Sequence, residues 1–389
     1  MDACYIDYDA THSFSDALNR YIRRDEKLKP FYAYYPDPDG FSGLLKSKKN
    51  NPDRLVLTEV LREQYATLPA LSSSVKENIR LLESKDTFTV TTGHQLNIFT
   101  GPLYFIFKIV SAINLAKELK EKFPDKNFVP VYWMASEDHD FAEINHTYLF
   151  GQKVVWNAEV NGATGRIDPQ SIQQALKQYR SALGISPNAK KLDEIISYAY
   201  TAFPTLAQST RYLVDALFGE YGLVILDADD KQLKSQFAAI TFQDISQQNS
   251  FRNINDSNRK LADLGVEAQV NPREINFFYL KDGLRERLIY ENERYLVNQT
   301  TISFSEDELR QEVESYPERF SPNVVMRPLY QEVILPNIAY IGGGAEMIYW
   351  LQLKSNFDFY GIDFPILLLR NSAMIVDETV GQKLQKLGL

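Results

Sequence analysis

Five short apolar runs, each closed by turn-forming or polar residues, predict the strands of one sheet. The first, DTFTVTTG at 86–93, is rich in β-branched residues and ends in Gly. The other four are FVPVYWMAS at 128–136, YGLVILDAD at 221–229, PNIAYIGG at 336–343 and FPILLLRN at 364–371. Continuously apolar strands are typical of sheets buried on both faces. The pattern therefore predicts an α/β fold built on a five-stranded parallel sheet of the Rossmann type.

Apolar positions at helical spacing predict helices before and between these runs. Residues 54–82 contain two such helices separated by LPALSSS, and residues 102–123 form a third that has Pro in its first turn. The strand at 86–93, this third helix and the strand at 128–136 make a β-α-β unit, which is right-handed by rule. The stretch AMIVDETVGQKLQKLGL opens a further helix.

The spacing of the strands divides the chain. Two intervals between them are far longer than an ordinary βα connection, so we expect each to form a subdomain at the strand ends. The expected parts are an N-terminal helical wrapping segment at 1–85, a first Rossmann β-α-β unit at 86–140, a first connecting insert at 141–220, a core strand at 221–229, a second connecting insert at 230–330, a second Rossmann part at 331–375 and the start of a C-terminal helix at 376–389.

The charge and composition of the chain restrict the classes of ligand that it is expected to bind. A formal net charge of −9 argues against nucleic acid as a partner, because phosphate backbones require a basic surface. The N-terminus carries acids where a signal peptide carries a basic run, and the longest apolar stretch, IFTGPLYFIF, is about half the length that spans a bilayer. The single cysteine, Cys4, cannot form an internal disulfide, in agreement with a reducing compartment. We expect a cytoplasmic protein that binds small molecules and no membrane.

Three of the four histidines lie in two segments that begin where apolar strands end, which is where open α/β sheets bind ligands. In the first segment, His94 is a candidate catalytic acid or base, because an ordinary histidine pKa is about 6.5. Gln95 and Thr100 are candidate substrate contacts. Gly93 and Gly101 are candidate cofactor contacts, since backbone N–H groups before a helix can hold an anion. A simple turn followed by a helix cap remains the alternative.

The second segment is SEDHDFAEINH. Were it helical, His139, Glu143 and His146 would share one face and could hold a metal, as in a metal-dependent hydrolase. The competing interpretation is acid–base chemistry without a metal, in which carboxylates orient His139 or grip a substrate amine. A capped, solvated helix start is the third. The candidate catalytic residues are Asp138, His139 and Asp140, and the candidate substrate contacts are Glu137, Asn145 and His146.

Two later segments offer anion-binding candidates. A glycine run between a strand and a helix lets backbone N–H groups approach a ligand, although it is neither G-x-G-x-x-G nor a Walker loop. The strand LLLRNS places a cation and a hydroxyl at its carboxyl end, and strand termination is the alternative there. The candidate cofactor contacts are Gly342, Gly343, Gly344, Glu346, Arg370 and Ser372. Arg327 and Glu332 are candidate substrate contacts, with a surface salt bridge as the alternative.

Four blocks carry a family resemblance. TTGHQLNIFTGPLY, VYWMASEDHDFAEINH, SPNVVMRPLYQEVILPNIAYIGGGAE and LLLRNSAMIVDE resemble, in this order, the signature blocks of the bacillithiol synthase family. The resemblance implies a Rossmann-type core related to class I nucleotidyltransferases, two connecting-peptide inserts and a C-terminal coiled coil that forms a homodimer. That coiled coil is largely missing from this chain, so we expect a monomer or a weak dimer.

The resemblance also implies an activity, which is condensation of cysteine with glucosaminyl malate to form bacillithiol. Amide formation from a free carboxylate in water is uphill, so we expect activation by ATP or another nucleotide with Mg²⁺, with no firmly predicted metal site. His94 or His139 would assist proton transfer. The alternatives are a metal-dependent hydrolase that uses His139, Glu143 and His146, and a non-catalytic ligand-binding protein of the same fold.

Overall fold

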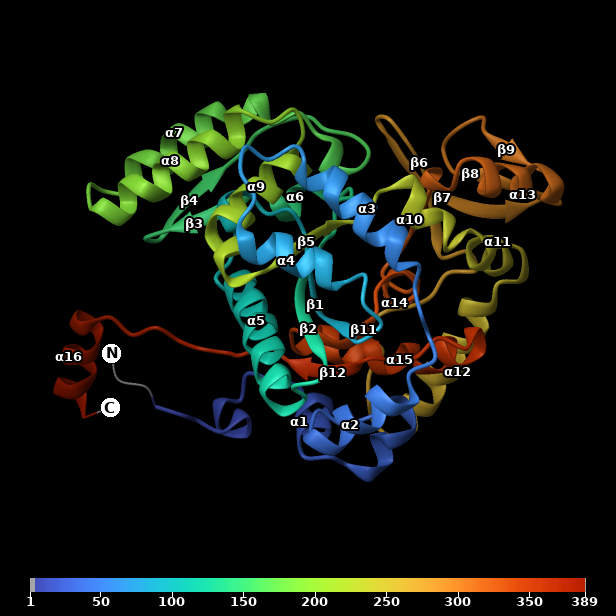
Figure 1. Ribbon diagram of the computed structural model, residues 1–389, viewed down its shortest axis with the longest axis horizontal. Coiled ribbons are helices and arrows are strands. Elements are labelled where there is room, and N and C mark those ends of the chain that lie inside the picture. Colours follow the sequence, from blue (N-terminus) through green and yellow to red (C-terminus); the bar gives the residue numbers. More distant parts are fainter. Residues whose placement is uncertain (1–3, 389) are drawn as a thin grey trace.

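A computed structural model describes residues 4–388 and contains a central sheet of five parallel strands in the order β12-β11-β1-β2-β5 (Figure 1). The predicted five-stranded parallel sheet is therefore confirmed. Its strands are β1 (Thr87–His94), β2 (Asn127–Met134), β5 (Val224–Asp227), β11 (Asn337–Gly342) and β12 (Ile366–Leu369).

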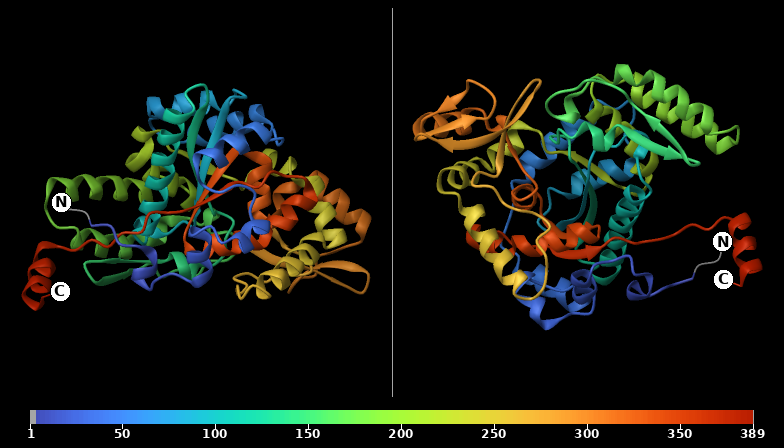
Figure 2. Two further views of the ribbon diagram at one scale, coloured as in Figure 1. Left: turned by 90° about the horizontal axis from the view of Figure 1, so that it is seen from below. Right: turned by 180° about the vertical axis from the view of Figure 1, so that it is seen from behind.

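Helices pack around the central sheet (Figures 1 and 2). Two helices within 54–82 and one within 102–123 were predicted, and α3, α4 and α5 confirm them. The helices are α1 (Asp16–Ile22), α2 (Pro38–Ser47), α3 (Arg54–Tyr65), α4 (Ser73–Leu81), α5 (Tyr104–Lys122), α6 (Phe141–Ile144), α7 (Gln173–Ala182), α8 (Pro187–Thr201), α9 (Leu206–Phe218), α10 (Lys231–Ser235), α11 (Ala238–Gln247), α12 (Asn249–Ala262), α13 (Glu306–Ser315), α14 (Arg327–Ile334), α15 (Gly344–Tyr360) and α16 (Glu378–Leu387).

The sheet packs through two hydrophobic clusters because side chains alternate between its faces. In the smaller cluster, Ala112 and Leu119 of α5 join Val90 of β1. The larger cluster contains Val131 of β2 and Trp350 of α15. Burial of both faces explains why the strands read as continuous apolar runs.

Two further sheets were not predicted. A five-stranded antiparallel sheet has the order β10-β6-β7-β8-β9, and a separate hairpin pairs β3 with β4. In Figure 1 the antiparallel sheet stands beside the parallel sheet, in orange. The strands are β3 (His146–Leu149), β4 (Gln152–Val155), β6 (Phe277–Lys281), β7 (Leu284–Glu291), β8 (Arg294–Val297), β9 (Ser303–Phe304) and β10 (Phe320–Pro322).

The segment after β2 corrects one expectation. Helix α6 spans only four residues, and His146 begins β3, where it pairs with Val155. His139, Glu143 and His146 therefore do not share a helical face, and the interpretation of this segment as one helix is wrong. The hairpin pairing holds His146 in extended backbone, which ends the helix.

The C-terminal segment leaves the body of the molecule after β12. Positions 371–380 are all exposed and α16 buries no residue, and Figure 2 shows this segment running outward. Within residues 4–388, no helix has the length and apolar character that crossing a bilayer requires.

Candidate active site

A cavity of about 900 Å³ opens at the carboxyl ends of β1 and β2. Its wall includes Gly93 and His94 from β1, and Trp133 and Met134 from β2. The opposite wall is formed by β6, β7 and the loop that precedes β6, and the starts of α14 and α15 complete it. This is the position at which open α/β sheets bind ligands.

His94 lies at the end of β1 with its ring largely enclosed by aromatic neighbours. The ring meets Phe105 edge-on at a centroid distance of 5.3 Å, and its Nδ1 lies 3.0 Å from the carbonyl oxygen of Gln95. Burial, assisted by the positive charge of Lys108, lowers the pKa of His94 to about 4. The expectation of an ordinary pKa of about 6.5 is therefore wrong. At neutral pH the uncharged ring donates through Nδ1–H and leaves Nε2 as an acceptor.

Beneath His94, a buried ion pair ties α5 to α15. Lys108 donates to the carbonyl oxygen of Gly93 at 2.9 Å and forms an ion pair with Glu346. The Glu346 carboxylate also accepts from Tyr340 Oη at 2.7 Å and from the backbone N–H of Gly343 at 2.8 Å. Burial opposes the charge of Glu346, but the attraction of Lys108 outweighs it and holds the pKa below its usual value.

Gly343, a predicted cofactor contact, is already engaged within the protein. The N–H of Gly343 already donates to a carboxylate of the same helix. A phosphate could use this donor only after Glu346 moved away. The N–H of Gly343 is therefore not open to an anion in this structure.

An acidic wall stands at the end of β2 and the start of α6. Gln95 donates through Nε2 to Asp138 Oδ2 at 2.5 Å and to Glu143 Oε2 at 2.6 Å. Asn97 donates through Nδ2 to the backbone carbonyl oxygen of Glu143 at 3.1 Å. Two carboxylates that share one amide can bind a substrate ammonium group, since an additional cation would relieve their mutual repulsion.

His139 contacts the opposite wall of the cavity. Arg285 Nη1 lies 2.6 Å from His139 Nδ1, and its guanidinium group stacks over Phe278 at 3.9 Å from the ring centroid. Arginine donates and cannot accept, so Nδ1 must be the acceptor and the ring proton lies on Nε2. The two cavity histidines therefore carry their protons on different nitrogens.

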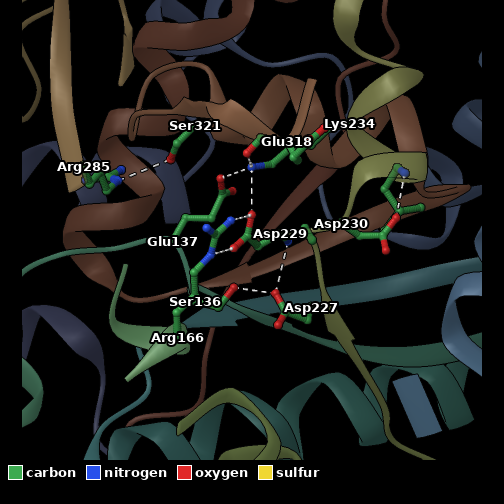
Figure 3. Close-up of polar contacts among 12 residues, drawn as sticks. Ser136, Glu137, Arg166, Asp227, Asp229, Asp230, Lys234, Arg285, Glu318 and Ser321 are labelled. Atoms are coloured by element: carbon green, nitrogen blue, oxygen red, sulfur yellow. Dashed lines mark hydrogen bonds and ion pairs between the residues drawn. The ribbon is translucent and has the colours of Figure 1, made fainter. Parts of the chain in front are cut away.

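Figure 3 shows a cluster of charged side chains that includes Glu137 of the cavity wall. Lys234 of α10 donates to Glu137 Oε1 at 2.5 Å, to Asp229 Oδ1 at 3.0 Å and to a backbone carbonyl. Arg166 adds two hydrogen bonds to Asp229, at 2.8 and 3.1 Å. Burial opposes ionisation of Asp229, but Lys234 and Arg166 outweigh it and lower its pKa. The cluster fixes Glu137 at the edge of the cavity.

The structure brings together part of the predicted site. His94 and His139 line one cavity, as expected from their positions at the ends of neighbouring strands. The predicted residues in its wall are Gly93, His94, Gln95, Glu137, Asp138, His139, Arg327 and Glu346. The predicted residues outside its wall are Thr100, Gly101, Asp140, Asn145, His146, Glu332, Gly342, Gly343, Gly344, Arg370 and Ser372.

Several residues outside the wall have a local role instead. Asp140 caps α6 by accepting from the N–H of Glu143, and Asn145 faces His146 across 3.2 Å. Arg370 lies beside the cavity rather than in it, with its guanidinium 5.4 Å from the Tyr104 ring centroid and 3.3 Å from Ser372 Oγ. The backbone bends sharply at Thr100 and Gly101, both of which have positive φ.

Glu332 is fully buried in α14, away from the cavity wall. Its Oε1 accepts from Gln331 at 2.8 Å and from Asn337, at the start of β11, at 2.7 Å. Its Oε2 is buried without a hydrogen-bond partner among residues 4–388. Burial raises the pKa of Glu332 to about 7.

Sequence reasoning missed most of the opposite wall of the cavity, which β6, β7 and the loop before β6 form. Arg285 and Arg287 alternate along LRERLIYE, a mixed pattern that has no turn or histidine to draw attention to it. Lys108 was hidden in an apolar helix, and its burial became visible only with the fold. The missed cavity residues with polar side chains include Lys108, Asn271, Arg273, Arg285, Arg287, Asn323, Tyr340 and Tyr349.

Across residues 4–388, no group of three or more His, Cys, Asp or Glu side chains is placed to hold a metal ion. His139, Glu143 and His146 are included in that search. The donor set that the hydrolase alternative needs is therefore not assembled.

Comparisons with known proteins agree on one family. The family model described as "Bacillithiol biosynthesis BshC, N-terminal Rossmann-like domain" matches residues 1–371. Relatives that carry the name "Putative cysteine ligase BshC" are 49% identical in Flavobacterium psychrophilum, over 99% of this chain and 72% of the relative, and 47% identical in Flavobacterium johnsoniae, over 99% and 73%. A third, from Christiangramia forsetii, is 44% identical over 98% of this chain and 72% of its own.

Proposed function

The chain belongs to the BshC family of bacillithiol biosynthesis, and on that premise we propose that it is a ligase that joins cysteine to the amine of glucosaminyl malate through an amide bond. The observation that carries this proposal is the cavity itself. Its lining contains a neutral histidine, His94, together with an acidic wall made by Asp138 and Glu143. Amide formation from an ammonium substrate needs both a site for the cation and a base for its proton.

The proposed reaction assigns one role to the acidic wall and one to each cavity histidine. The acidic wall binds the sugar ammonium, and loss of a proton frees the lone pair of the amine. The amine attacks the carboxyl carbon of cysteine, a C–N bond forms, and the bond to the activating group breaks. The ammonium loses two protons in becoming an amide: the first passes to solvent before attack, and His94 Nε2 accepts the second as the C–N bond forms. His139 Nε2–H donates a hydrogen bond to the carbonyl oxygen as charge develops on it.

Activation of the carboxyl group needs a co-reactant, because a free carboxylate does not react with amines in water. We propose ATP or another nucleotide with Mg²⁺ for this role. The N–H of Gly343, one of the contacts predicted for it, is not free without a rearrangement, since it donates to Glu346. We therefore assign no residue to the nucleotide and no step to a phosphate contact.

The proposal is tested by supplying the purified protein with cysteine, glucosaminyl malate and each nucleotide in turn with Mg²⁺. We expect mass detection to show bacillithiol with at least one nucleotide and none when cysteine is omitted. A matched variant, Asp138→Asn with Glu143→Gln, removes both charges of the acidic wall and should raise the KM for glucosaminyl malate. If no nucleotide supports product from folded protein, the ligase proposal is wrong.

A further inference from the structure

The opposite wall of the cavity and the start of α14 carry arginines to which the proposed reaction assigns no role. Arg285 and Arg287 lie two apart on β7, so their side chains project from the same face of that strand. Arg273 lies in the loop before β6, and Arg327 begins α14. All four line the cavity.

These arginines lack carboxylate partners. Within residues 4–388, none of the four has a carboxylate oxygen within 4.0 Å. Arg285 instead contacts His139 and, at 3.3 Å, Ser321 Oγ. Arg327 donates to the neutral Gln331 at 2.9 Å, and its Nη2 is buried with no hydrogen-bond partner in the described part of the chain. A buried guanidinium nitrogen without a partner is costly, so the missing partner of Arg327 Nη2 should be a bound anion. Arg285 is half-buried and Arg273 and Arg287 are exposed, so these three side chains are free to contact the same anion.

The charge balance in the cavity indicates the kind of anion. The other charged side chains in the wall are largely neutralised internally, because Lys108 pairs with Glu346 and Glu137 pairs with Lys234. What remains is the four arginines against Asp138 and Glu143. Four positive charges against two negative charges leave an excess of positive charge, which favours a ligand that carries more than one anionic group.

We propose that Arg273, Arg285, Arg287 and Arg327 form a receptor for a dicarboxylate, and that it holds the malyl end of the second substrate while the acidic wall holds the sugar amine. The assignment rests on the proposed function for the identity of that substrate. Guanidinium groups suit this task because each can bind a carboxylate through two parallel hydrogen bonds. The two ends of the substrate would then bind to walls of opposite charge, and this would fix the orientation of the substrate in the cavity.

The test uses L-malate as the probe, titrated calorimetrically into the full chain, with L-lactate and inorganic pyrophosphate as comparison anions. Arg287→Gln and Arg273→Gln remove exposed members of the receptor and should leave the fold intact. Arg294→Gln is the matched control, because Arg294 lies on the neighbouring strand β8 and pairs with Glu308 outside the cavity. We expect malate to bind at least about tenfold more tightly than lactate, and either receptor variant to weaken malate binding by about tenfold or more while the control stays within about twofold.

Turnover supplies an independent readout. In the receptor variants the KM for glucosaminyl malate should rise by about tenfold or more, while the KM for cysteine changes little. Malate binding that is equal in parent and variants would overturn the receptor. Pyrophosphate that binds more tightly than malate, and is lost in the same variants, would also overturn it and assign the arginines to a nucleotide. Malate binding that depends on the arginines, in a protein that forms no bacillithiol, would support the receptor and reject the proposed ligase activity.

Discussion

At the scale of single residues, the two cavity histidines differ in which ring nitrogen carries the proton. His94 directs Nδ1 to the carbonyl oxygen of Gln95, whereas His139 accepts from Arg285 at Nδ1. The first therefore offers an acceptor at Nε2 and the second a donor. Because the pKa of His94 is lowered to about 4, it can take up a proton in passing but does not store one at neutral pH. This division suits a base paired with a carbonyl-polarising donor.

We predict that His94→Asn cuts product formation by at least about a hundredfold and leaves the melting temperature nearly unchanged. Asn keeps a hydrogen-bonding side chain but cannot accept a proton at neutral pH. His146→Asn is the control, since His146 lies outside the cavity wall and should retain turnover within about twofold. Steady-state assays with mass detection of the thiol and thermal melts decide the matter. Near-normal turnover in His94→Asn would remove His94 from the mechanism.

The sequence indicated His94 but not its environment. Its place at the end of a β-branched run was enough to predict a crevice position. Its pKa was not predictable, because the ring is enclosed by Phe105 and opposed by Lys108, and both lie on the following helix. Glu332 shows the reverse case. It was predicted as a substrate contact with a surface salt bridge as the alternative, yet the fold buries it fully against Asn337.

Glu332 leads to a prediction about pH and stability. Its pKa of about 7 in the folded chain lies above an unfolded value of about 4.3, so the folded state favours the protonated form. Its contribution to stability is fully present below the unfolded pKa and is lost as the pH rises through about 7. A shift of roughly 2.5 to 3 pKa units corresponds to about 3 to 4 kcal/mol of unfolding free energy.

Glu332→Gln should therefore be more stable than the parent by about 3 kcal/mol at pH 8.5, and the difference should shrink to about 1 kcal/mol at pH 5. Gln mimics the protonated carboxyl group and keeps the oxygen that accepts from Gln331 and Asn337. Urea unfolding at the two pH values measures the effect. Glu314→Gln, at an exposed position of α13, is the control and should show no such gain. Equal stability of Glu332→Gln and parent at pH 8.5 would contradict the buried-acid interpretation.

At the scale of elements, the short helix α10 is attached to the core mainly through the side chain of Lys234. Its N-terminus is capped by Asp230, which accepts from the N–H groups of Gln232 and Leu233. This cap directs Lys234 inward, where it is 3% exposed between Glu137 and Asp229. A five-residue helix that carries little apolar surface is thus attached to the core largely by an ion cluster.

Lys234→Met should lower the free energy of unfolding by about 3–5 kcal/mol, because it leaves two buried carboxylates with a single arginine. Lys231→Met on the same helix removes an equal charge from a side chain that is 57% exposed, and should cost less than about 1 kcal/mol. Chemical denaturation of both variants provides the comparison. A Lys234 variant that is as stable as the Lys231 variant would show that the cluster contributes no net stability.

The parallel sheet could be predicted from the sequence, whereas the antiparallel sheet could not. The strands of the parallel sheet were predicted because burial on both faces leaves an uninterrupted apolar run. The antiparallel sheet was missed because its strands face solvent on one side and carry charges, as in LRERLIYE of β7. The arginine wall was missed with it, since no local pattern tells a solvated arginine from one that faces a cavity.

At the scale of the whole molecule, the folded body ends shortly after β12. The N–H of Asn371 still donates to Ser111 Oγ at 3.1 Å, but positions 372–380 are exposed and α16 buries nothing. Deletion of residues 373–389 should therefore shift the melting temperature by less than about 2 °C, because it removes no packed surface. Scanning calorimetry tests this. Deletion from residue 364 onward is the contrasting variant, since it removes β12 and should prevent folding.

The strand order also has a consequence for synthesis on the ribosome. Thr89 of β1 hydrogen-bonds to Asn337 at the start of β11, 248 residues later in the chain. At bacterial or similar elongation rates of about 5–20 residues per second, β1 waits on the order of 12–50 s for that neighbour. During this interval the nascent chain exposes an open strand edge, which is the kind of surface that drives aggregation. The demand on chaperones is therefore set by the topology, and it falls on the middle of the sheet rather than on its borders.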